Sequence, residues 1–193
     1  MSSRFDDLVV TDPRAMRALA HPVRLAILTQ LQRSGPATAS GLSSSVGATP
    51  SVTSWHLRHL ASFGLVADAD PAEVPGDGRT RWWQARARGF SVEVGDDPEA
   101  REAGRLLGDA LRRAADEQVD AWHRDVEPVL EPVWQARSGV SNTSITLTAQ
   151  ELARLQDDVD ALLAPYVLRA AGAAPSGARR VRLVRTWLPD GPG

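Results

Sequence analysis

The stretch TASGLSSSVGATPSVTSWHLRHLASFG constrains the fold most, because it holds two helices with almost no chain between them. Thr38 or Ser40 caps a first short helix, and Gly47 then permits a sharp turn. Thr49, followed by a proline, begins a second helix that stops at Gly64. The sequence therefore predicts two short helices joined at a steep angle.

Two further helices are expected before this stretch. Asp12 caps a helix that begins with a proline, and a His21-Pro22 step starts the next one. The second of these helices ends at a Ser-Gly-Pro sequence, and its apolar stripe consists of Val23, Ile27, Leu28 and Leu31.

A β-hairpin is expected after these helices. The segments LVAD and RTRWWQAR have the composition of short strands, and Asp77-Gly78 between them is a hairpin signal. Arg79 and Arg81 follow that turn. The first half of the chain is thus predicted to be a bundle of short helices followed by a hairpin.

The second half begins with a long helix, predicted from Pro98 to about Glu127. An alternating segment, TSITLT, indicates a strand, and a capping box at Thr148 and Glu151 begins another amphipathic helix. The segment RVRLVRTWLP indicates a closing strand. We therefore expect two regions, residues 1–94 and 95–193, the second containing a long helix and a small α/β part.

The helix that begins at Thr49 has two chemically different faces. At 100° per residue, one face carries Thr53, His56, Leu57 and Leu60, which we expect to face the core. The opposite face carries Ser51, Ser54, Trp55, Arg58 and Ser62. A plain solvated surface is one interpretation. A nucleic-acid surface is the other, because small hydroxyl residues allow close approach and Arg can donate to guanine or phosphate.

The order of the elements favours the second interpretation, because a short helix, a tight turn, a second helix and a hairpin make up a winged helix-turn-helix. The residues also resemble the DNA-binding domain of ArsR-type bacterial transcriptional regulators. The resemblance rests on ALAHPVRLAILTQL, on SWHLRHL and on the GLV exit, and it covers about residues 13–88. It implies a homodimer that binds double-stranded DNA, usually as a repressor.

On this interpretation the outer face of the second helix reads the major groove. The expected groove-reading residues are Ser51, Val52, Ser54, Trp55 and Arg58. Thr38 and His59 are expected on the DNA backbone, and Arg79 and Arg81 on phosphate or in the minor groove. The alternative is a winged-helix module that binds protein and not DNA.

No metal or cofactor is expected. The chain has no cysteine, so the thiolate metal site of the metal-sensing ArsR-type members cannot form here. Asp120, His123 and Glu127 share one face of the long helix, but one histidine with two acids is more typical of a solvated surface.

Four aromatic residues in the second half have two possible roles. They either line an apolar pocket for a small-molecule effector or fill the core of the α/β part. These residues are Trp122, Trp134, Tyr166 and Trp187. The resemblance to ArsR-type regulators implies that the long helix, Pro98 to about Glu127, forms the dimer interface.

Composition supports a regulator more than an enzyme. Residues 1–90 carry 10 Arg against 7 acidic residues, a charge of +3, whereas residues 91–193 carry 12 Arg against 17, a charge of −5. A basic half beside an acidic half favours a polyanionic partner for the first half. We found no phosphate-binding glycine loop and no nucleophile elbow, so no catalytic residue is expected. A cytoplasmic, membrane-free protein is expected, since no signal peptide or long apolar run is present.

Overall fold

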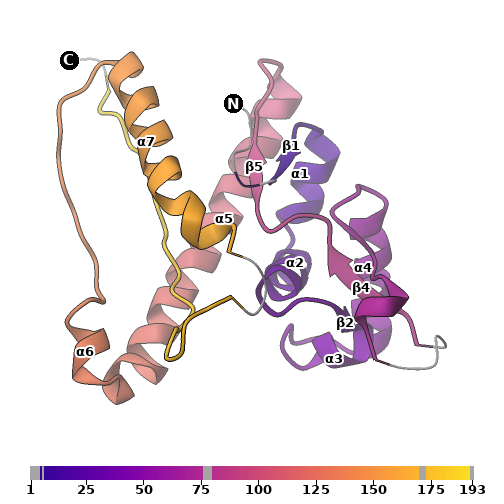
Figure 1. The fold of residues 1–193 in the computed structure, drawn as a ribbon. Helices are drawn as coiled ribbons and strands as arrows, with labels where there is room; N and C mark the ends of the chain where they lie inside the picture. The colour runs from indigo at the N-terminus through magenta and orange to yellow at the C-terminus, as the bar shows by residue number, and fades with distance from the viewer. Residues whose placement is uncertain (1–4, 6, 76–79, 170–172, 192–193) are drawn as a thin grey trace. The chain divides into compact units, whose positions relative to one another are not determined.

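The computed structural model describes residues 5, 7–75, 80–169 and 173–191. The chain divides into two compact units, Met1–Glu117 and Gln118–Gly193, and Figure 1 shows their helices and strands. Each unit is described by itself below.

Four short helices form the body of the first unit (Figure 1). In chain order they are α1 (Pro13–Leu19), α2 (Pro22–Ser34), α3 (Ala39–Ser43) and α4 (Pro50–Ala61). The side chains of Asp12, Thr38 and Thr49 accept a hydrogen bond from a backbone N–H in the first turn of α1, α3 and α4. Because these caps satisfy N–H groups that lack a helical partner, they fix where each helix begins. The predicted helix starts are confirmed, and Thr38 rather than Ser40 caps α3.

The predicted hairpin is present and forms part of a three-stranded antiparallel sheet. β3 (Val66–Asp68) pairs with β4 (Trp82–Ala85), and β4 also pairs with β2 (Ala37–Thr38), so the strand order is β2-β4-β3. A 3-10 turn, η1 (Pro71–Glu73), follows β3. The predicted turn at Asp77-Gly78 lies outside the described residues.

A second, parallel pair of strands was not predicted. β1 (Leu8–Val10) pairs with β5 (Phe90–Val92), and the four helices α1 to α4 lie between the two strands in the sequence. Three residues per strand carry too little alternation to be recognised in a sequence.

The core of the first unit lies where α1, α2 and α4 meet the strands. Trp83 is 2% exposed and is the largest of the fully buried side chains. The other members of the buried cluster come from α1 to α5, from β1 and β3, and from the residue just before β3. They are Val10, Ala15, Met16, Leu19, Ile27, Leu28, Leu31, Leu42, Leu57, Leu60, Leu65, Val66, Ala103 and Leu107.

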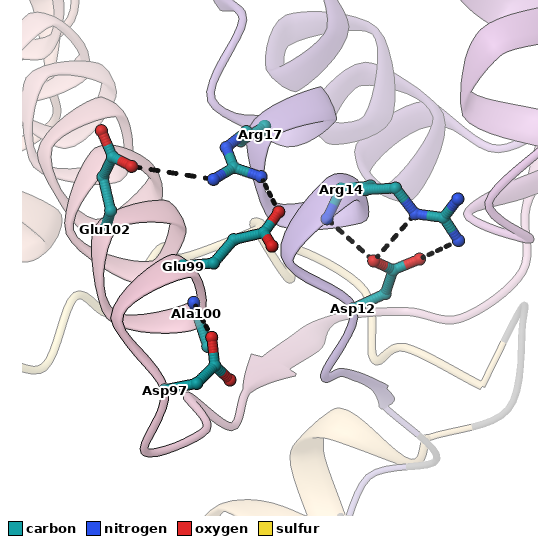
Figure 2. Close-up of polar contacts among 7 residues, drawn as sticks. All are labelled: Asp12, Arg14, Arg17, Asp97, Glu99, Ala100 and Glu102. Carbon is teal, nitrogen blue, oxygen red and sulfur yellow. Dashed lines mark hydrogen bonds and ion pairs between the residues drawn. The ribbon is translucent and has the colours of Figure 1, made fainter.

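The predicted long helix is α5 (Pro98–Asp125), and its residues up to Glu117 belong to the first unit. Its buried residues are Ala100, Ala103, Leu107 and Ala110. Figure 2 shows how α1 is tied to this helix: Arg17 donates to Glu99 at 2.6 Å and lies 3.7 Å from Glu102. The functional boundary predicted between residues 94 and 95 stays a prediction, but the compact unit itself extends to residue 117.

The small α/β part predicted in the second unit is wrong, because its strands are absent. The unit contains η2 (Glu127–Val129), α6 (Pro132–Gln135) and α7 (Ala149–Val167). Among the described residues after β5 there is no strand, so TSITLT and RVRLVRTWLP are extended chain without a sheet partner. Ile145 is 57% exposed and Val181 is 73% exposed. An alternating sequence forms a strand only where the edge of another strand is available to pair with it.

The second long helix of this unit was predicted correctly. The Thr148 side chain and the Glu151 side chain each bond to the other residue's backbone N–H, which completes the capping box. The Thr148 backbone N–H and the Thr148 hydroxyl both donate to the Glu151 carboxylate, and these two hydrogen bonds lower the pKa of that carboxyl. The apolar stripe of α7 is at most half-buried, and no described residue of the second unit is buried.

Candidate nucleic-acid interface

The two faces of α4 are divided as the sequence predicted. Thr53, His56, Leu57 and Leu60 are its buried residues. On the opposite side Ser51, Val52, Trp55 and Arg58 are exposed and Ser54 is half-buried. Trp55 is 54% exposed and Val52 44% exposed, which are high values for large apolar side chains in a unit that has its own core. The helix therefore presents an apolar and cationic outer face.

Trp55 is held in place by a line of aromatic rings along α4. Its indole stacks on the imidazole of His59, with ring centroids 5.6 Å apart and planes 7° from parallel. His59 in turn meets Phe63 edge to face at 5.3 Å. This aromatic line, Trp55–His59–Phe63, follows the four-residue spacing of one helix face. Sequence analysis missed the contribution of Phe63, although its spacing from His59 could have revealed it.

Arg58 is also oriented before any partner arrives. Its Nη1 donates to the Ser54 Oγ one turn earlier, at 2.9 Å, and the side chain is otherwise on the exposed face. A guanidinium has five N–H donors, so this bond leaves others for an acceptor outside the protein. Arg58 therefore lies beside Trp55 on the same surface, with its direction partly set.

Thr38 is placed at the start of α3, where its Oγ accepts a hydrogen bond from the Gly41 N–H at 3.0 Å. A hydroxyl that accepts in a cap can still donate its own proton. The side chain is half-buried, so it is accessible to an acceptor in solvent.

Of the two arginines predicted to act in the wing, the structure describes only Arg81. Arg81 donates to Asp68 through Nε at 2.6 Å and through Nη2 at 3.2 Å. Its guanidinium carbon also lies 3.9 Å from the centre of the Trp83 ring. Arg81 is therefore bound within the hairpin, although just over half of its side chain is exposed. Arg79 lies outside the described residues.

Three histidines lie close together, two of them on α4 and the third just before α2. The rings of His21 and His56 lie 4.8 Å apart, a contact that sequence analysis did not foresee. Burial lowers the pKa of both imidazoles, and the positive charge of Arg24 lowers them further. Burial likewise lowers the pKa of His59. All three histidines are therefore biased toward the neutral form.

Two buried polar atoms on the inner face of α4 have no hydrogen-bond partner among the described residues. They are the Nδ1 of His56 and the Oγ1 of Thr53. His56 is 95% buried, so the structure places it in the core as predicted. Beside these histidines, the Nε of Arg24 donates to the main-chain oxygen of Ala18, near the end of α1, at 2.6 Å.

The four aromatic residues of the second unit are not brought together by any ring contact within the described residues. Trp122 meets the neighbouring His123 ring, Trp134 lies 5.5 Å from the Arg179 guanidinium, and Tyr166 lies beside Arg169. Trp187 is half-buried. The effector pocket formed by these residues stays a prediction.

His123, near the end of α5, pairs with Glu127, the first residue of η2. The Nδ1 of His123 lies 2.7 Å from the Glu127 carboxylate. Across the described part of the chain, no group of three His, Cys, Asp or Glu side chains is arranged to hold a metal ion. Within the same part, no helix combines the length and apolarity required to cross a bilayer.

Comparison with known proteins supports a helix-turn-helix assignment. Residues 19–68, which contain α2, α3, α4 and β3, match a family described as "Helix-turn-helix domain". No curated protein sequence matches this chain.

Two solved structures from Mycobacterium tuberculosis are similar over most of the chain. One is the MarR family protein Rv2887 in complex with salicylic acid, at 18% identity, covering 78% of this chain and 85% of that one, with a TM-score of 0.31. The other is Rv1404, at 14% identity, covering 77% of this chain and 84% of that one, with a TM-score of 0.30. Superposition this poor supports no conclusion about function. The family match and the observed fold together show that the first unit contains a helix-turn-helix domain, to which β3 and β4 add a wing.

Proposed function

We propose that this protein is a sequence-specific DNA-binding transcriptional regulator that acts as a homodimer, most simply as a repressor. One observation carries the proposal: the second helix of the helix-turn-helix presents an exposed indole and a guanidinium on its outer face. A large apolar ring that stays exposed to solvent, in a unit whose core is already formed by other residues, is typical of a binding surface.

The chemistry of that face fits the major groove of DNA. Arg58 can donate two hydrogen bonds to the O6 and N7 of guanine, and Ser51 and Ser54 are small enough to let the helix approach. Val52 and Trp55 supply apolar surface for a thymine methyl group. The outer face of α4 therefore offers both polar and apolar contacts to base edges.

Other residues are proposed to position the helix. Thr38 at the start of α3 and His59 beside Trp55 would contact the phosphate backbone, as would Arg79 and Arg81 of the wing. Such contacts fix the register of a protein on DNA without reading the sequence. The homodimer would place two copies of α4 in successive major grooves, which a palindromic operator would match.

The regulator is proposed to be of the ArsR type but not to use a thiolate metal site, since it has no cysteine. An effector, if one acts through the second unit, would bind near Trp122, Trp134, Tyr166 and Trp187.

Fragments of the source genome selected by the purified protein would supply the operator and test the proposal. On a selected duplex, replacing both Trp55 and Arg58 by Ala should weaken binding by at least about tenfold, since each base pair contact contributes about 1–3 kcal/mol. Arg154→Ala is the matched control, because it removes an exposed arginine of α7 and should leave binding unchanged. Affinity measured by fluorescence anisotropy would decide.

Salt dependence separates DNA binding from the alternative, a winged-helix module for protein. Phosphate contacts release counterions, so the logarithm of the DNA association constant should fall steeply and linearly with the logarithm of salt concentration. Binding that survives the double substitution would mean that α4 is not the reading helix. Absence of any salt-sensitive duplex binding would favour the protein-binding alternative.

A further inference from the structure

A cluster of basic side chains lies beside the aromatic line of α4. His21 stands just before α2, Arg24 lies in the first turn of α2, and His56 and His59 lie on α4. The rings of His21 and His56 are 4.8 Å apart, and the Trp55 ring meets both His56 and His59. We call His21, Arg24 and His59 the cationic cluster, because these three side chains reach solvent whereas His56 is buried.

The cationic cluster has hydrogen-bonding capacity that the protein does not use. His21 occupies the N-cap position of α2, but its side chain makes no capping hydrogen bond. Arg24 donates to the Ala18 carbonyl through Nε, and a guanidinium has four further N–H donors. Within the part of the chain that the structure describes, the hydrogen bond at His59 involves its main-chain oxygen and not its ring. The cluster therefore offers several donors to an acceptor outside the protein.

No carboxylate among the described residues competes for these donors. The elements that pack most closely against α4 are α1, α2, α3 and β3. Their charged side chains, apart from Arg24, already have partners, as does the arginine of α4 itself. They are Arg14 and Arg17 of α1, Arg33 of α2, Arg58 of α4 and Asp68 of β3. An anion that approaches the cluster therefore meets positive charge without an acidic rival.

The two histidines of the cluster are mainly neutral in the free protein. Burial is the first cause of the lowered pKa of His21 and of His59, and the positive charge of Arg24 is the second. A phosphate beside them would change this balance, because a nearby anion favours the imidazolium form. The phosphate would also offset the repulsion that Arg24 exerts. The imidazoles would then gain protons from solvent as the anion binds.

We propose that His21, Arg24 and His59 form a phosphate-binding site beside the outer face of α4, and that its two histidines take up protons when the site is occupied. The occupant is a backbone phosphate of the duplex that α4 reads, so this inference rests on the proposed function. His59 connects the site to the reading face, since its ring stacks on Trp55. Because coupling between two binding events is reciprocal, proton uptake makes the DNA affinity rise as the pH falls.

The first experiment measures operator affinity between about pH 8 and pH 6, the range in which histidines titrate. Fluorescence anisotropy at constant ionic strength should show the affinity rising by about fivefold or more toward the acid end, the usual scale of coupling between two sites. The comparison is confined to pH values at which the circular dichroism spectrum is unchanged. An affinity that is independent of pH would overturn the proton uptake.

Substitutions assign the effect to the cluster. His21→Gln and His59→Gln keep a polar side chain that cannot ionise, so each should reduce the rise and the double variant should abolish it. His123→Gln is the matched control, because it removes an exposed histidine of α5 and should keep the full rise. Loss of ring packing alone would weaken binding equally at every pH. A full rise in the double variant would therefore overturn the site.

Arg24 is tested by separating its charge from its hydrogen bond to Ala18. Arg24→Gln should weaken operator binding, whereas Arg24→Lys keeps the charge and should retain most of the affinity. Arg33→Gln, which removes an exposed arginine at the other end of α2, should leave the affinity unchanged. Equal losses in Arg24→Gln and Arg24→Lys would show that the charge of Arg24 does not hold the phosphate.

The site can also be tested without DNA. Sulfate is the probe, because it presents oxygens as phosphate does and keeps its double charge over this pH range. Exchanging chloride for sulfate at equal ionic strength should move the NMR titrations of the His21 and His59 ring protons to higher pH. The titration of His123 should stay in place. Identical titrations in the two salts would overturn the anion site.

The outcomes separate the site from the proposed function. A protein that bound no duplex would contradict the proposed function, while the sulfate titration would still decide on the anion site. Duplex binding that depends on Trp55 and Arg58, with a pH profile unaffected by the histidine substitutions, would overturn the site and leave the proposed function standing. A response to sulfate without any pH dependence of operator affinity would mean that the site takes a free anion, and would overturn the backbone phosphate as its occupant.

Discussion

At the scale of single residues, His56 shows how packing sets the charge state of a titratable side chain. His56 is buried, its ring meets His21, and its Nδ1 has no partner within the described residues. An imidazolium there would lose hydration without gaining a carboxylate in return. The neutral imidazole therefore serves as a flat, moderately polar core residue.

This arrangement predicts that the first unit loses stability in acid. The folded-state pKa values of His21, His56 and His59 are lowered from the unfolded value of 6.5, so the unfolded chain binds more protons at mildly acidic pH. The stability that these groups contribute is complete above pH 6.5 and is lost as the pH falls through their folded values. Urea denaturation at a series of pH values would measure the loss.

The matched substitutions are His56→Leu and His123→Leu. His56→Leu removes a buried histidine, so the free energy of unfolding should fall less steeply with decreasing pH. His123→Leu removes an exposed histidine that pairs with Glu127, and it should leave the fall produced by His56 in place. Identical slopes in His56→Leu and the unaltered protein would show that His56 does not contribute.

A second prediction concerns Trp83, the largest fully buried side chain, and its contribution to stability. Trp83→Ala should cost about 3–5 kcal/mol of unfolding free energy, the usual cost of removing a large aromatic ring from a core. Trp82→Ala, at a half-buried neighbour, should cost much less. Chemical denaturation of both variants would compare them, and similar losses would contradict the burial assigned to Trp83.

At the scale of elements, α5 contains two glycines that test how it packs. A Cβ on Gly104 would come within 2.6 Å of the Val94 side chain, whereas a Cβ on Gly108 would meet nothing within 4 Å. Gly108→Ala should therefore stabilise the protein by about 0.5–1 kcal/mol through helix propensity. Gly104→Ala should lose that gain to the contact with Val94. Thermal unfolding of the two variants would show the difference, and equal gains would mean that α5 does not approach Val94.

The elements that could be predicted are those with local signals. Asp12, Thr49 and Thr148 cap their helices through hydrogen bonds to residues two or three positions on, so the sequence alone reveals them. β1 and β5 could not be predicted, since their pairing joins short segments far apart in the chain. The alternating segments around Ile145 and Val181 misled for the opposite reason: they have a strand's pattern and no partner edge.

The candidate site was predictable in part for the same reason. Helical periodicity divides α4 into its buried and exposed faces without any knowledge of the rest of the fold. The partner of Arg81 was not predictable, because Asp68 lies on the neighbouring strand and only the register of the hairpin brings the two together.

At the scale of the whole molecule, stability is concentrated in the first unit. Every buried residue in the described part of the chain lies between Val10 and Ala110, so none belongs to the second unit. A chain ending after Asp125, the last residue of α5, should therefore keep the denaturation midpoint of the full protein within experimental error. Urea denaturation followed by circular dichroism would check this. A large fall in the midpoint would show that the second unit stabilises the first.

The ion pair between Asp68 and Arg81 gives the wing a property that a free arginine would lack. Any phosphate that draws on Arg81 first has to displace a carboxylate held through two nitrogens, and the abandoned carboxylate then repels the same phosphate. In the proposed DNA complex Asp68 would therefore act as an internal competitor, and only a duplex seated on α4 would supply the additional binding energy needed to exchange one anion for the other.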